Sequence, residues 1–77
     1  MSSHRFDNFT KLEGSGHLDG AKFDSLNRKM TVRFSNGYIY EVHGISADSY
    51  QQFLNAPSHG EHWHSHIKDS YHVERVR

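Results

Sequence analysis

The chain has 77 residues, enough for one domain but too few for a second hydrophobic core. Nine Lys and Arg balance nine Asp and Glu, which argues against a general polyanion-binding protein with one strongly basic face. Cysteine is absent, so disulfides and thiolate metal sites are excluded.

Apolar residues are spread along the chain and form no long run. The first residues contain no apolar signal segment, and no apolar stretch approaches the ~18 residues of a membrane span. We therefore expect a cytoplasmic protein that is neither secreted nor inserted in a membrane.

The N-terminal part is predicted to contribute little to the core. Residues 1–14 are expected to form a tail or strap, in which residues 9–12 have the composition of an edge strand. A Gly-Ser-Gly segment at residues 14–16 then interrupts regular structure. A single domain is predicted over residues 15–77, and its first full strand over residues 18–24.

The loop between the next two strands determines their register. A two-residue loop at Asn36-Gly37 would place Glu41 on the apolar face of the hairpin. A three-residue loop that starts at Ser35, with Gly37 left-handed at a bulge, keeps one continuous apolar face. We therefore expect these pairs across the hairpin: Phe34 with Tyr38, Val32 with Tyr40, and Met30 with Val42.

A first helix is predicted after the hairpin. Ser46 is its expected N-cap, because a serine hydroxyl accepts a hydrogen bond from a free backbone amide of the first turn. Pro57 disfavours helical continuation of the residue before it, so the helix must end by that point. The apolar stripe expected to face the sheet consists of Tyr50, Phe53 and Leu54.

A second helix follows directly. Ser58 and Glu61 have the spacing of a capping box, and the helix is predicted to run to about Ser70. Trp63 and Ile67 are four residues apart, so they are expected to face the sheet together.

The last residues alternate apolar and polar side chains over residues 73–76 and have the pattern of a strand that returns to the sheet. We predict an α+β fold with a three- or four-stranded antiparallel sheet, followed by two helices packed on one face. The predicted order is β-β-β-α-α.

Several motifs of the second half occur together in one known family. They are the Tyr38-x-Tyr40 pair, the Ala-Pro-Ser-x-Gly segment at residues 56–60, and the later Trp63, Ile67 and Tyr71. In this combination the chain resembles the KTSC domain, a small module found alone in bacterial and phage proteins and at the C-terminus of some lysyl-tRNA synthetases. The resemblance covers about residues 15–76. It implies the α+β fold, carries no established activity and points to RNA binding.

The signature tyrosines allow two interpretations. Rings exposed on a sheet stack on bases, which is the basis for the RNA hypothesis. The predicted register instead places both rings beside apolar side chains and under the first helix. We favour this interpretation and predict that all four signature residues are core residues: Tyr38, Tyr40, Trp63 and Ile67.

Basic residues are concentrated around the hairpin. Lys22, Arg28, Lys29 and Arg33 are the candidates for contacts with nucleic acid, extended by Lys68 where the tail folds back. The competing interpretation is an ordinary solvated surface of mixed charge.

Six of the eight histidines lie from residue 43 onward. His62 and His66 are one helical turn apart, the spacing of two-His zinc sites, and His59 is placed to add a third ligand. No buried carboxylate or cysteine completes the set, so we favour the interpretation without a dedicated metal. The sequence indicates no cofactor.

No strained nucleophile turn or catalytic triad is apparent, so we expect no enzyme and no small-molecule substrate. The favoured hypothesis is a binding module for RNA or tRNA. The alternative is a protein-binding adaptor, such as a bacterial or phage regulator that docks on RNA polymerase. A third hypothesis is a metal or pH sensor built on the histidines.

Overall fold

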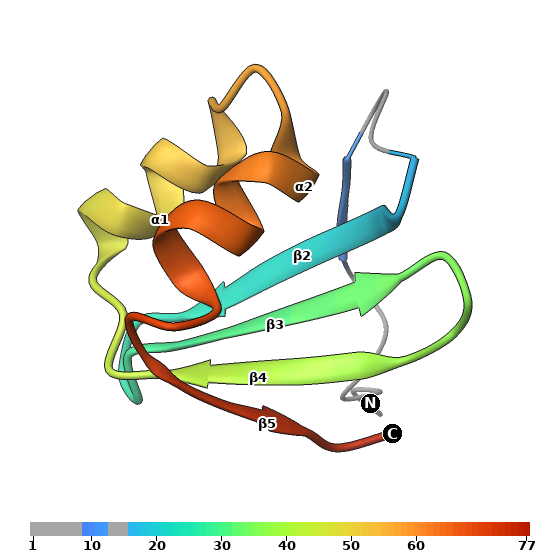
Figure 1. Ribbon diagram of the computed structural model, residues 1–77. Helices are drawn as coiled ribbons and strands as arrows, with labels where there is room; N and C mark the ends of the chain where they lie inside the picture. The colour runs from blue at the N-terminus through green and yellow to red at the C-terminus, as the bar shows by residue number, and fades with distance from the viewer. Residues whose placement is uncertain (1–8, 13–15) are drawn as a thin grey trace.

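A five-stranded antiparallel sheet forms one layer of the computed structural model, which describes residues 9–12 and 16–77. The strands are neighbours in chain order: β1 (Thr10–Lys11), β2 (Leu18–Asp24), β3 (Lys29–Phe34), β4 (Ile39–His43) and β5 (His72–Arg75). Between β4 and β5 the chain forms α1 (Ala47–Leu54), α2 (His59–His62) and the π-helical segment η1 (Trp63–Ile67). These helical segments cover one face of the sheet, and β5 lies at its edge (Figure 1).

The α+β class is as predicted, but three or four strands are too few, and the chain order ends in a strand. The difference lies at the two edges of the sheet. β1 has two residues and β5 has four, and both form by pairing with distant parts of the chain. Residues 9–12 and 73–76 both had the predicted character of strands, and counting both as members of the sheet gives the five strands observed. Of the predicted tail at residues 1–14, only residues 9–12 are described, and they include β1.

The hairpin has the predicted register. Met30 pairs with Val42 and Val32 with Tyr40. The Phe34 amide donates to the Tyr38 carbonyl at 2.8 Å, which closes the three-residue loop. Gly37 has a φ of 95°, a conformation that costs glycine little because it has no Cβ.

Both helix starts are capped as expected. The Ser46 hydroxyl accepts from the Ser49 amide at 3.1 Å, and the Ser58 hydroxyl accepts from the Glu61 amide at 3.3 Å. The second helix differs from the prediction: it changes to π-helical pairing, in which the Lys68 amide donates to the Trp63 carbonyl five residues earlier at 2.8 Å, and it ends at Ile67 and not at Ser70. Nothing in the residue types of this turn indicates the change.

The core lies between the sheet and the helical layer. Tyr50 stacks on Phe23 with the ring centroids 5.0 Å apart, which joins α1 to β2. Trp63 and Ile67 are buried. The buried cluster consists of Leu12, Leu18, Ala21, Met30, Val32, Val42, Ile45, Tyr50, Phe53, Trp63 and Ile67.

The opposite face of the sheet, called the outer face below, has a different character. Because side chains alternate along a strand and the strands pair in register, it collects polar and charged residues. Its members include Lys22, Asp24, Lys29, Thr31, Arg33, Ile39, Glu41, His43, His72 and Glu74.

No helix within residues 9–12 and 16–77 has the length and hydrophobicity that a membrane span requires.

Candidate functional site

Three aromatic side chains meet where the second helical segment crosses the sheet. Trp63 begins η1, Phe34 ends β3 and Tyr40 lies in β4. The indole of Trp63 packs edge-on against Phe34 at 5.4 Å and Tyr40 at 5.9 Å, measured between ring centroids. Trp63 is buried, whereas the other two rings are half-buried. The trio therefore closes the core and also reaches the surface.

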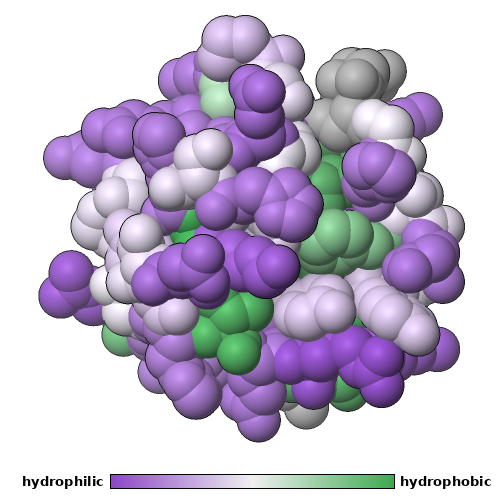
Figure 2. All heavy atoms as spheres, viewed as in Figure 1, coloured by the Kyte–Doolittle hydropathy of each residue, from purple (hydrophilic) through white to green (hydrophobic). Residues whose placement is uncertain are grey.

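Two hollows lie beside this trio. One of about 560 Å³ extends toward β2 and the start of α2, and the other of about 420 Å³ extends toward β5. Phe34, Trp63 and His64 line both, so the hollows are two ends of one surface. In the view of Figure 2, patches of hydrophobic and pale surface lie between hydrophilic side chains. We call this surface the aromatic groove and define it by Phe34, Tyr40, Trp63, His64, Lys68 and Val73.

Tyr38 lies beside the aromatic groove and not in the core. Its side chain is 43% exposed, so the prediction that it is a core residue is wrong. Tyr38 precedes β4 at the loop end of the hairpin. The Arg75 guanidinium lies over its ring, 4.3 Å from the centroid. The alternation of the strand was predicted correctly, but the buried part of the face ends before this residue.

The charges at the rim of the groove are mixed. Lys68 and Asp69 lie at one end and Glu61 at the other. Within the part of the chain that the structure describes, neither Lys68 nor Arg75 has a carboxylate within ion-pair distance. Both cations are therefore available to a ligand.

On the outer face, two of the basic residues that were predicted to contact nucleic acid form ion pairs with carboxylates of the protein. The Nζ of Lys29 lies 3.3 Å from an oxygen of Glu41, whose carboxylate is largely buried. The Nε of Arg33 donates to a carboxylate oxygen of Asp19 at 3.0 Å. These cations are neutralised by the protein itself.

The remaining candidates lie in three different settings. Lys22 has its Nζ 5.1 Å from the centroid of the Phe9 ring, which Arg33 also contacts at 4.7 Å. Arg28 is exposed in the turn after β2 and has a φ of 52°. Lys68 lies at the aromatic groove. The structure therefore divides the predicted basic cluster between two surfaces.

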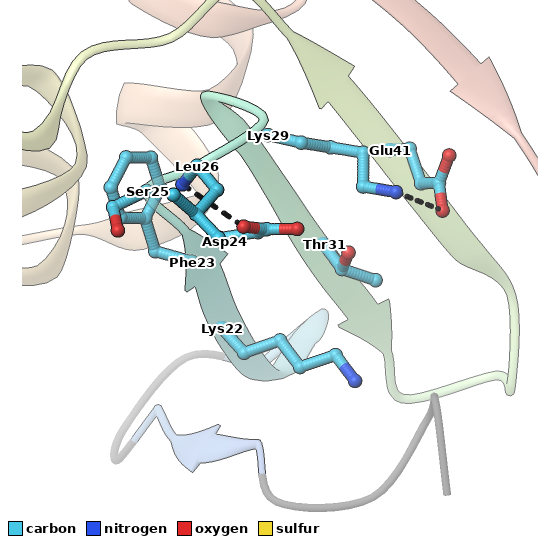
Figure 3. A pocket seen from close by; sticks show the side chains of 8 residues that line it. All are labelled: Lys22, Phe23, Asp24, Ser25, Leu26, Lys29, Thr31 and Glu41. Atoms are coloured by element: carbon cyan, nitrogen blue, oxygen red, sulfur yellow. Dashed lines mark hydrogen bonds and ion pairs between the residues drawn. The ribbon is translucent and has the colours of Figure 1, made fainter. Parts of the chain in front are cut away.

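Another hollow, of about 450 Å³, lies on the outer face near the turn after β2. Asp24 organises this turn by accepting from the Leu26 amide at 3.1 Å and from the Asn27 side chain at 2.8 Å. The hydrogen bonds from Asn27 are the main reason that the pKa of Asp24 lies below its ordinary value. Figure 3 shows Lys29 directed at Glu41 and the Asp24 carboxylate directed at the turn.

The structure does not bring the three predicted histidine ligands together. The rings of His62 and His66 are 4.6 Å apart, but the Nε2 of His59 contacts the Leu54 carbonyl at 3.1 Å. Burial, followed by the charges of His66 and His59, lowers the pKa of His62 below 6.5. Among the described residues, the three-member group with metal-ligand spacing is His43, His72 and Glu74.

Two features of the groove were missed from the sequence. From the sequence, Phe34 is one of several alternating apolar residues of a strand, and His64 is one of several histidines of the second helix. The sequence predicts both the hairpin register and the inward position of Trp63. Taken together, these two predictions place the end of β3 under Trp63. Whether the side chains at the end of β3 are buried or exposed depends on where the helical layer packs on the sheet.

Comparisons with known proteins agree with this architecture. The KTSC domain family matches residues 14–71. The lysine–tRNA ligases of Trichormus variabilis and of a Nostoc species are each 29% identical to the chain over 66 residues. These matches cover 86% of the chain and 12% of each ligase, so the chain corresponds to a small part of those enzymes.

A solved structure gives the same fold. The crystal structure of a KTSC domain protein from Yersinia pestis superposes with a TM-score of 0.81 at 21% sequence identity. The match covers 90% of this chain and 96% of the other. At this identity the similarity establishes the fold alone.

Proposed function

The chain belongs to the KTSC domain family, and on that premise we propose that it is a non-catalytic module that binds single-stranded RNA in the aromatic groove. The observation that carries the proposal is the group of Phe34, Tyr40 and Trp63, which lines hollows on both sides. Base stacking on aromatic side chains is the usual way in which small domains hold unpaired nucleotides.

The charges beside the groove suit a short ligand. Lys68 and Arg75 have no carboxylate partner in the described part of the chain, and the Arg75 guanidinium lies over the Tyr38 ring. Contact with two phosphates would give a slope of about −1.4 for the logarithm of affinity against the logarithm of salt concentration. This weak salt dependence is compatible with a chain of zero net charge.

The relatives support the choice of RNA. The two similar ligases are named for tRNA, so a region like this chain occurs in enzymes that handle an RNA. We extend this to the present chain as a proposal: the ligand is an unpaired segment of RNA, and the site of action is the cytoplasm.

A fluorescence titration tests the proposal. Trp63 is the only tryptophan, so its emission reports on the groove. We expect a single-stranded oligouridine to quench it at low salt. Lys68→Ala and Arg75→Ala should each weaken binding and reduce the salt slope by about 0.7.

Lys22→Ala is the matched control, because it removes a lysine from the outer face and leaves the groove intact. We expect it to bind like wild type. Loss of binding in Lys22→Ala alone would move the site to the outer face, and absence of binding by wild type at low salt would exclude the RNA proposal.

One observation favours a protein partner as a second candidate. Leu26 is 93% exposed at the tip of the turn beside the outer-face hollow, an unusual position for a large apolar side chain. An adaptor that docks on a larger complex would insert such a residue into its partner. Leu26→Ser would abolish capture of that partner and leave RNA binding unchanged.

A further inference from the structure

Two pairs of side chains face each other across β4 and β5 on the outer face. His43 is opposite His72 and Glu41 is opposite Glu74 in the strand register. Directly opposed residues of antiparallel strands have Cβ atoms about 4.5–5.5 Å apart, so their side chains converge. The four residues therefore form a compact group of nitrogen and carboxylate ligands that joins two strands.

The distances within the group are short. The Nε2 of His43 lies 3.4 Å from the Oε1 of Glu74, and the rings of His43 and His72 are 5.3 Å apart. One ligand atom from each of His43, His72 and Glu74 lies within 4.8 Å of the other two.

A second observation concerns the Nε2 atom of His43. It is buried, yet it makes no hydrogen bond with any residue in the described ranges. Buried polar atoms without a partner are rare in folded proteins, and a bound ion is one way in which such an atom is satisfied. The atom faces the carboxylates of Glu74 and Glu41, at 3.4 and 3.7 Å.

Glu41 is held in place next to the group. Its Oε2 pairs with the Nζ of Lys29 at 3.3 Å, and its Oε1 lies 3.7 Å from the Nε2 of His43. Because this is the same Nε2 that faces Glu74, the carboxylate of Glu41 adds negative charge beside a cation bound there.

We propose that His43, His72 and Glu74 form a Zn²⁺ site that ties β5 to β4. Two imidazoles and a carboxylate suit zinc, whereas Mg²⁺ and Ca²⁺ prefer oxygen ligands alone. In a tetrahedral zinc site with bonds of about 2.0–2.1 Å, ligand atoms lie about 3.4 Å apart. The separation of His43 and Glu74 already has this value.

Two of the three proposed ligands lie outside the part of the chain that matches the family. His72 and Glu74 lie beyond residues 14–71, which match the family. Because β5 is an edge strand with mostly exposed residues, a metal that bridges it to β4 would hold the C-terminal end of the sheet in place. Zinc that binds only the folded state raises its stability by mass action.

Thermal unfolding with added Zn²⁺, paired with calorimetric titration, tests the site. We expect zinc to raise the melting temperature of wild type, and Mg²⁺ to leave it unchanged. His72→Ala and Glu74→Gln should each lose the zinc-dependent rise and weaken zinc binding at least 10-fold. Both side chains are exposed, so the variants should fold, which their circular dichroism would establish.

His66→Ala is the matched control, because it removes an exposed histidine of η1 that neighbours His62. We expect it to keep the zinc-dependent rise in melting temperature. Retention of the rise in His72→Ala, or its loss in His66→Ala, would overturn the proposal. A wild type that does not respond to zinc would also overturn it.

Discussion

The aromatic groove and the outer face both carry basic side chains, but these side chains differ in whether a carboxylate of the protein pairs with them. On the outer face, Lys29 and Arg33 lie against carboxylates of the same molecule. At the groove, Lys68 and Arg75 have no carboxylate partner in the described part of the chain and lie next to aromatic rings. Two of the four cations predicted around the hairpin are therefore less available to a ligand, because the folded chain supplies them with counter-charges.

Among the variants that test this difference between the two surfaces, the largest loss of stability is expected from Trp63→Ala. Trp63→Ala removes the side chain that closes the core and forms the groove, and should cost about 3–5 kcal/mol of the free energy of unfolding. A domain of this size has a total of only about 4–12 kcal/mol, so much of the protein would unfold. Urea unfolding followed by circular dichroism measures the change. A loss below about 1 kcal/mol would show that Trp63 contributes to the groove but not to the core.

A smaller effect is expected at Gly20, under Phe9 on the outer face. A Cβ at this position would lie 2.8 Å from the Cβ of Phe9 and 3.2 Å from the Thr10 carbonyl oxygen. Gly20→Ala should therefore push β1 away and cost about 1–3 kcal/mol. Gly16→Ala is the control, because its Cβ would meet nothing within 4 Å. Equal melting temperatures for the two variants would show that Phe9 does not pack there.

The ion pairs of the outer face should differ in strength. The Lys29–Glu41 pair is more buried than the Arg33–Asp19 pair, since the two carboxylate side chains are 10% and 45% exposed. We expect Lys29→Ala to cost about 1–2 kcal/mol and Asp19→Ala less than about 1 kcal/mol, because solvent screens the exposed pair. Chemical unfolding of both variants measures this. The reverse order would mean that these cations are not held by the carboxylates as described.

The smallest effect is expected from proton binding at His62 in the helical layer. Its folded-state pKa lies below 6.5, so below pH 6.5 the unfolded chain takes up a proton that the folded protein resists. This contribution to stability is complete above pH 6.5 and is lost as the pH falls through the folded-state pKa. Melting temperatures of wild type and His62→Gln between pH 7.5 and 5 measure it. The variant should lose less stability on acidification, and an identical acid dependence would contradict the assignment.

Local chemistry was sufficient to predict much of the fold. Gly37 and the loop around it determined the hairpin register, and Ser46 and Ser58 marked both helix starts. Each of these signals acts over a few neighbouring residues, so no tertiary information is needed to interpret it. The resemblance to the KTSC domain then indicated how the strands and helices are arranged in one α+β fold.

The remaining features depend on long-range contacts. The pairing of β5 with β4, which brings His72 next to His43, joins segments almost 30 residues apart. The exposure of Tyr38 depends on where the helical layer ends, and the ion pairs of the outer face depend on the strand register. A pattern of residue types does not specify which cations will be neutralised by the folded chain.

The most direct test of the account is an NMR titration of ¹⁵N-labelled protein with a single-stranded oligouridine at low salt. We expect shifts of the Trp63 indole and of amides at His64, Lys68 and Arg75, with little change at Lys22, Lys29 and Arg33. Shifts confined to the outer face would contradict the central claim, because they would show that its paired cations form the binding surface and the aromatic groove does not.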